Sequence, residues 1–121
     1  MSYDYEDLVD RIARDTPGFV GAAVVDLDTG MTLAVRNADP TFDLTTASAF
    51  NSEMVKQKLK IMEALGLDSE LEDMLLTLSD QIHLIKLLGR TTFIYLAARR
   101  EGSNLAIVRN AVQRNIGEVL V

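Results

Sequence analysis

The chain contains no cysteine. This absence excludes disulfides, thiol chemistry and sulfur-ligated metals, and it is typical of cytoplasmic proteins. No apolar run approaches the roughly 20 residues that a membrane-spanning helix needs. The acidic residues near the start, Asp4, Glu6 and Asp7, are the opposite of a signal peptide's basic start. We therefore expect a cytoplasmic protein that does not insert into membranes.

Clusters of lysine and arginine are also missing, and the formal net charge is −6. Nucleic acid is therefore not an expected partner, because its phosphates require clustered cations. The acidic balance favours solubility and is compatible with a basic partner surface. No glycine-rich segment ends in Gly-Lys-Ser/Thr, the loop that cradles nucleotide phosphates. The chain is therefore not itself a GTPase.

Candidates for catalysis are few. His83 is the only histidine and falls on an apolar strand, where a core or interface role is expected. Asp26 and Asp28 flank a turn, where aspartates are ordinary, whereas a general acid–base pair needs a pocket and tuned pKa values. We therefore expect no enzymatic activity, no cofactor and no metal site.

What is present is the composition of a folded globule, with 121 residues, 48% hydrophobic and 25% charged. This length fits one domain, residues 1–121. The C-terminal half contains three apolar strand-like runs, Asp73–Leu78, Ile82–Leu88 and Thr92–Ala98, separated by short turns. Such short connections cannot cross over to a parallel neighbour, so the strands form an antiparallel meander. Both faces of the middle strand are apolar, which predicts cover on both sides.

The remaining segments predict helices and a hairpin. Apolar residues from Tyr5 to Ala13 recur at helical spacing. Phe19–Leu27 and Met31–Val35 are typical strands joined by a tight turn, and a final amphipathic helix begins at Ser103-Asn104. With a long central helix, the predicted fold class is α+β: a five-stranded antiparallel sheet with helices on its faces, in the order α-β-β-α-β-β-β-α.

The central helix, about Thr46 to Leu65, carries two apolar seams roughly 110° apart. One stripe is enough to cover a sheet, so we interpret one seam as facing the chain's own sheet and the other as facing a partner subunit. The alternative is a monomer that cradles the helix deeply. The first seam contains Phe50, Met54, Ile61 and Leu65, and the second contains Val55, Leu59 and Met62.

Two segments carry a resemblance to a known family. Gly18 to Asp26, with the turn Asp28-Thr29-Gly30, forms a small-residue strand that ends in an aspartate-rich turn. Thr91–Ala98, followed by Glu101–Arg109, forms a strand, a turn with glycine and asparagine, and a helix with an early arginine. Together with the element order, these segments resemble the Roadblock/dynein light chain family, bacterial branch, over nearly the whole chain. The segment Ala47–Phe50 is more polar than in that family.

The resemblance implies a Roadblock/profilin-like fold and a binding module without chemistry of its own. Family members form homodimers or heterodimers by pairing their central helices and joining edge strands into one sheet. Their usual role is to bind or regulate small Ras-like GTPases, or to act as adaptors in larger assemblies. We expect no function that would be seated in a long N-terminal extension.

Within that implied homodimer we assign two surfaces. The dimer interface is expected at the second seam, because a monomer would expose it as an apolar patch, and at the edge strand Asp73–Leu78, whose Leu75 and Leu76 lie on opposite faces. The GTPase is expected on the outward strip of the paired helices, doubled by the twofold axis. The interface residues are Val55, Leu59, Met62, Leu75 and Leu76; the partner-binding residues are Glu53, Lys56, Gln57, Lys60 and Glu63.

The sequence does not identify the GTPase, the cellular process, or whether the chain stimulates GTP hydrolysis or only docks. It leaves open a homodimer or a heterodimer. A small-ligand sensor or a general assembly adaptor is the alternative function, and a large cavity against the sheet would favour the sensor.

Overall fold

The computed structural model describes residues 4–120, which form three helices and one five-stranded sheet. Helix α1 begins after Asp4, whose carboxylate accepts a hydrogen bond from the Asp7 amide at 2.9 Å, and such a cap satisfies a backbone donor that the helix leaves free. The elements in chain order are α1 (Tyr5–Asp15), β1 (Phe19–Asp26), β2 (Thr32–Asn37), α2 (Leu44–Ala64), β3 (Asp73–Thr77), β4 (Gln81–Leu88), β5 (Thr92–Arg99) and α3 (Leu105–Val119).

The predicted fold class and element order are confirmed. The strand order is β2-β1-β5-β4-β3, and every neighbouring pair is antiparallel. Strands β3 to β5 form the predicted meander, and β3 lies at an edge as expected. The first hairpin instead packs β1 against β5, so that the last strand lies in the middle of the sheet.

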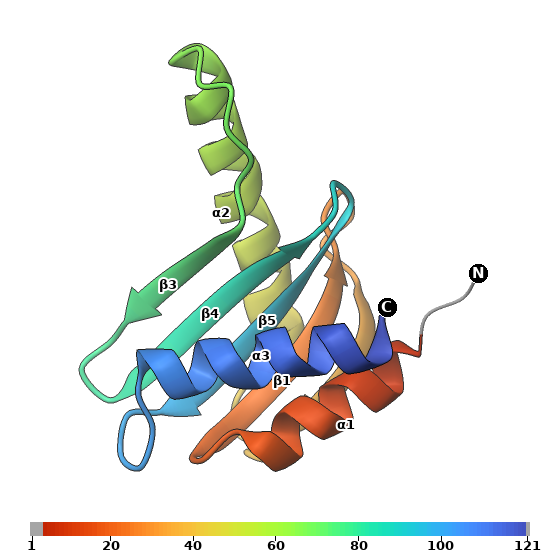
Figure 1. Cartoon of the computed structure of the whole chain (residues 1–121), viewed down its shortest axis with the longest axis vertical. Helices are drawn as coiled ribbons and strands as arrows, with labels where there is room; N and C mark the ends of the chain where they lie inside the picture. Colours follow the sequence, from red (N-terminus) through yellow and green to blue (C-terminus); the bar gives the residue numbers. More distant parts are fainter. Residues whose placement is uncertain (1–3, 121) are drawn as a thin grey trace.

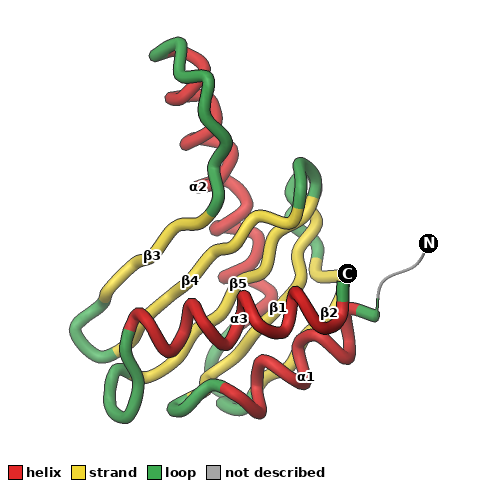
Figure 2. Tube along the Cα trace, in the orientation of Figure 1, coloured by secondary structure: helices red, strands yellow, loops and turns green. Residues whose placement is uncertain are grey.

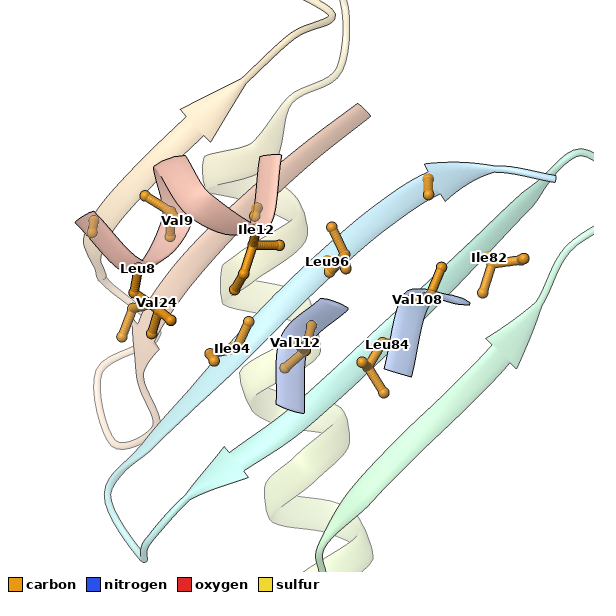
Figure 3. Packing of buried hydrophobic residues seen from close by; sticks show 13 residues of the cluster. Leu8, Val9, Ile12, Val24, Ile82, Leu84, Ile94, Leu96, Val108 and Val112 are labelled. Atoms are coloured by element: carbon orange, nitrogen blue, oxygen red, sulfur yellow. The ribbon is translucent and has the colours of Figure 1, made fainter. Parts of the chain in front are cut away.

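Helices cover both faces of the sheet (Figures 1 and 2). Helices α1 and α3 lie side by side on one face, where Leu8, Ile12 and Val112 pack over β1, β5 and β4 (Figure 3). Helix α2 lies on the other face, over a second apolar cluster that includes Val25, Phe93 and Tyr95. The two-sided cover predicted for β4 is confirmed, because Leu84 belongs to the first cluster and Ile85 to the second.

Glycine permits α2 to approach the first hairpin closely. Gly30 has a positive φ of 74°, and a Cβ added there would lie 3.2 Å from the Cα of Ala49. The C-terminal half of α2 extends past the sheet, and residues 66–72 return along it to β3 (Figure 1). This arrangement leaves the part of the sheet near β3 without a covering helix on the α2 face, and this is where the candidate site lies.

Candidate functional site

Helix α2 is fixed at both ends by its own sequence. Asp43 caps its start by accepting hydrogen bonds from the amide and hydroxyl of Thr46, at 3.0 and 2.6 Å, and these bonds lower the pKa of Asp43. The helix therefore begins two residues earlier than predicted. At its end, Gly66 has a φ of 67° and its amide donates to the carbonyl of Glu63 at 3.0 Å, a glycine stop of the expected kind.

The seam predicted as the dimer interface faces the chain's own sheet. Val55 is 0% exposed, Met62 is buried, and Leu59 packs against the same core cluster. A side chain without exposed surface has none left to bury against a partner. The premise that a monomer would expose this seam as an apolar patch is therefore wrong. The assignment of Val55, Leu59 and Met62 to a dimer interface stays a prediction, which their burial within the chain does not support.

The first seam, by contrast, is mostly exposed to solvent. Phe50 is 72% exposed and Leu65 is 68% exposed, and Ile61 is exposed as well. Met54, the remaining member, is half-buried and packs against the core. The two seams thus have the predicted separation, but the exposed one is the first seam and not the second.

Two serines explain how the helix is rotated. Ser48 and Ser52 are both buried, and the Ser52 hydroxyl donates to the carbonyl of Leu27 in the hairpin at 2.7 Å. Their small side chains, and the hydrogen bond of Ser52, allow the helix to lie close to the hairpin of β1 and β2. Sequence reasoning counted these serines as polar and missed them; their helical spacing with Val55 was the available signal.

The strip predicted to bind a GTPase is mostly on the outside. Glu53, Gln57, Lys60 and Glu63 are exposed. Lys56 differs, because it is half-buried and its ammonium group donates to the carbonyl of Asp28 at 3.1 Å and pairs with Glu53 at 3.1 Å. This lysine ties α2 to the first hairpin, so it is only partly available to a partner.

The edge strand β3 presents Leu75 and Leu76 on opposite faces, both half-buried. Leu75 lies opposite Leu84 and packs against the cluster under α1 and α3. Leu76 lies opposite His83, on the part of the α2 face that α2 does not cover. Pairing of this strand with a second subunit stays a prediction.

His83 lies in a small polar cluster on that uncovered face. Its Nε2 donates to Oε1 of Gln81 at 2.7 Å, which leaves Nδ1 to accept from the Tyr95 hydroxyl at 3.2 Å. Its ring also meets the edge of Phe42, with centroids 6.3 Å apart. Burial lowers the pKa of His83, against an opposing effect of Asp80, and burial raises the pKa of Tyr95 to about 12. The imidazole is therefore neutral at physiological pH.

A hollow of about 660 Å³ opens where α2 leaves the sheet. Leu59, Leu71 and Leu87 form its apolar wall, and Glu70, Glu72, Lys86 and Arg90 contribute charges of both signs. Its size falls within the range of small-ligand sites, but charges of both signs line it, so they do not indicate one class of ligand.

Asp26, considered above with Asp28, performs a structural task. It accepts hydrogen bonds from the amide and hydroxyl of Thr29, at 3.0 and 2.6 Å, which lower its pKa and close the hairpin turn. In the described part of the chain, no three histidine or carboxylate side chains gather closely enough to hold a metal ion. Within residues 4–120, no helix is both long and apolar enough to cross a bilayer.

These features define a class of fold. A meander joined to a hairpin, with two helices on one face and one long helix on the other, is the Roadblock fold, in the form found in the bacterial MglB proteins. Myxococcus xanthus MglB superposes with a TM-score of 0.82 at 14% identity, over 94% of this chain and 89% of that one.

A Roadblock/LC7 domain from Streptomyces avermitilis gives a TM-score of 0.81 at 16% identity, over 95% of this chain and 93% of that one. Profilin IA from Acanthamoeba castellanii gives 0.61 at 12% identity, with 95% of both chains covered, which confirms the profilin-like topology. No protein-family model matches the sequence, and no curated protein does. At such low identities the likeness is one of fold.

Proposed function

We propose that this chain is a Roadblock-family protein of the bacterial branch, a cytoplasmic homodimer without catalytic activity that regulates or scaffolds a small Ras-like GTPase. Residues 1–121 would make up its single domain. The fold supports this proposal, and so does the family role that the sequence resemblance implies. Among the described residues, the geometry supplies apolar and charged surfaces for binding rather than a site for chemistry.

The observation that supports the dimer proposal is the exposed apolar seam of α2, together with the face of β3 that no helix covers. Phe50, Ile61 and Leu65 are exposed, and the half-buried Met74 and Leu76 lie on the uncovered face of β3. Exposed apolar side chains gathered on one helix face are typical of an interaction site. A second copy that brings the same seam against this one would bury both, as a twofold interface requires.

The dimer is tested by placing lysine on this seam. We expect Phe50→Lys with Ile61→Lys to give a folded monomer, because two charges would be buried at the interface. The control is Leu105→Lys on α3, since Leu105 and Ile61 are both 42% exposed; it should stay dimeric. Light scattering gives the mass. An unmodified protein that is monomeric at micromolar concentration would end the dimer proposal.

The GTPase is proposed to bind the outer strip of α2. In a dimer with antiparallel α2 helices, two copies of Glu53, Gln57, Lys60 and Glu63 would form one charged platform. Arg100, at the end of a hairpin, is a poor candidate for insertion into a nucleotide site, since it donates to the carbonyl of Leu78 at 3.2 Å. Any stimulation of hydrolysis would act by reordering the GTPase's own switch segments.

Lys60→Glu with Glu63→Lys tests this platform without touching the hairpin. Exposed rim charges act mainly on association, so we expect a slower on-rate and altered salt dependence for a P-loop GTPase encoded nearby, with the dimer unchanged. Lys56→Glu is a less specific probe, because it also removes the bond to Asp28. The control is Asn110→Glu with Gln113→Lys on α3, which places the same two charges at the same spacing on exposed positions. Equal binding by the platform variant and the unmodified protein would move the site elsewhere.

A small-ligand sensor is the second candidate, and the hollow beside Leu59 and Leu87 is the observation that favours it. Its mouth adjoins the proposed dimer interface, so a ligand there would change the dimer's mass or stability. A metabolite panel that shifts neither would leave the binding module as the function.

A further inference from the structure

The two most exposed large apolar side chains among the described residues lie on one helix. Phe50 is 72% exposed and Leu65 is 68% exposed, and both belong to the first seam of α2. At 1.5 Å and 100° per residue, they lie about 22 Å apart along the helix and about 60° apart around it. Leu65 caps the end of α2 that extends past the sheet (Figure 1). A surface that covers the seam must therefore be long enough to reach both ends.

The first seam has the same spacing when it is read from either end. Intervals of four, seven and four residues separate its members, Phe50, Met54, Ile61 and Leu65. Their exposure follows the same order, because the two ends are the most exposed, whereas Met54 is half-buried and Ile61 is 42% exposed. A helix with this pattern is complementary to a second copy of itself that runs in the opposite direction.

One antiparallel register brings both ends of the seam into contact. If Phe50 of one copy lies opposite Leu65 of the second copy, the twofold axis repeats the same contact at the other end. Met54 then lies opposite Ile61. A shift of one helical turn would instead place Leu65 opposite Thr46, or leave Phe50 past the end of the partner helix. Only the unshifted register gives every member of the seam an apolar neighbour.

A parallel pair would also bring the ends together, but the charges beside the seam oppose it. Glu53 and Lys60 are exposed and lie within about 20° of each other around the helix. In a parallel pair each would meet its own copy, and contacts between like charges are unfavourable. In the antiparallel register neither meets its own copy. Lys58, nearest the axis, meets its own copy in both arrangements and does not distinguish them.

We propose that α2 pairs with α2 of a second, identical chain in the antiparallel register that sets Phe50 against Leu65. This inference rests on the dimer proposed above, and it adds which chain is the partner and which side chains meet. An identical chain is favoured because a different chain would have to carry the same spacing in reverse. Discrimination between partners is then a matter of contacts made or lost at the two ends of the seam.

Mixing two charged variants tests the contact. Phe50→Lys alone and Leu65→Glu alone should each weaken the dimer, because each places two unpaired charges at the interface. In the mixed dimer, the introduced ammonium group and carboxylate face each other at one end, and the other end is unmodified. We expect at least about fivefold more mixed dimer than in the control mixture, where Leu65→Lys replaces Leu65→Glu and two cations meet. Native mass spectrometry separates the mixed dimer from both homodimers.

Introduced thiols give a second readout, because the chain has no cysteine. A disulfide requires Cα atoms within about 7 Å of each other. Phe50→Cys combined with Leu65→Cys in one chain should therefore give covalent dimers on oxidation. Each single variant is the control and should not, since the two copies of one position lie about 22 Å apart in this register.

The register is overturned by any of three results. These are cross-linking of Phe50→Cys alone, a double cysteine variant that is dimeric but does not cross-link, and equal amounts of mixed dimer with Leu65→Glu and Leu65→Lys. The proposed dimer would survive all three. A monomeric mass of the unmodified protein in light scattering would instead end the dimer and the register together.

Discussion

At the scale of single residues, His83 is the side chain through which pH is expected to affect stability. It is the only histidine in the chain, it is half-buried, and both ring nitrogens have partners. The sequence predicted a core or interface histidine, and the structure places His83 on β4, in contact with Tyr95 of β5. Protonation would replace the acceptor at Nδ1 with a donor, which would face a tyrosine hydroxyl that must then accept.

We predict that stability falls as the pH drops below about 6.5, the ordinary histidine pKa. Burial lowers the pKa of His83 in the folded state, so the unfolded chain binds the proton more readily, and stability is complete above the unfolded pKa and declines below it. Urea unfolding at about pH 6 and pH 8 measures this decline. His83→Gln should reduce it; the same decline in that variant would assign it to other groups.

At the scale of elements, the carboxylate of Asp15 is one of the links between α1 and α3. Asp15 ends α1 and accepts from Arg14 at 3.0 Å, from Arg114 at 3.2 Å and from Asn115 at 3.0 Å. Asn115 is fully buried in α3. Hydrogen bonds from these groups, chiefly from Arg14, hold the pKa of Asp15 far below its usual range.

Asp15→Asn should lower the free energy of unfolding at neutral pH by about 2 kcal/mol, the order of a hydrogen bond to a charged group. The difference from the unmodified protein should shrink as the pH falls below about 4, because a carboxylate with a depressed pKa loses its contribution on protonation. Denaturant titrations at both pH values measure it. Asp10→Asn, on the exposed side of the same helix, is the control and should change little.

Helix α2 shows which parts of the candidate site could be predicted from the sequence. The spacing of the apolar residues along α2 was enough to predict the angle between its two seams, because that angle follows from helix geometry alone. It could not fix the rotation of the helix, which depends on Gly30 meeting Ala49 and on the Ser52 hydroxyl reaching Leu27. These contacts join residues distant in sequence, so periodicity does not report them.

The element order was predictable because short connections leave few topologies. The order of the strands within the sheet was less predictable, since the pairing of β1 with β5 joins the two halves of the chain. The start of α2 was misplaced by two residues because the cap at Asp43, rather than the first apolar residue, sets it.

At the scale of the whole molecule, the sheet has one edge at β2 and the other at β3. The Leu78 amide donates to the carbonyl of Gln81, and the Leu87 amide donates to the carbonyl of Glu72. Because hydrogen-bonded and non-bonded pairs alternate along antiparallel strands, the amide of Leu76 points toward β4, and the amides of Leu75 and Thr77 point outward. A dimer that continues the sheet across its twofold axis would bond these outward amides.

We predict that the amides of Leu75 and Thr77 exchange slowly at high protein concentration and quickly on dilution. The amide of Leu76, which bonds to β4, should exchange slowly under both conditions and is the internal control. Hydrogen exchange followed by NMR at two concentrations measures all three. Fast exchange at Leu75 and Thr77 in a proven dimer would show that subunits join through α2 without joining their sheets.

The end of α2 that extends past the sheet has a consequence for how the protein is turned over. The residues after Met62, from Glu63 to the returning residues 66–70, are exposed, and this part of the chain lies past the end of the sheet (Figure 1). Segments of this kind open locally and are where proteases cut first. If the proposed dimer covers this segment, a subunit without its partner would be degraded first, and the amount of protein in the cell would follow the amount assembled rather than the amount synthesised.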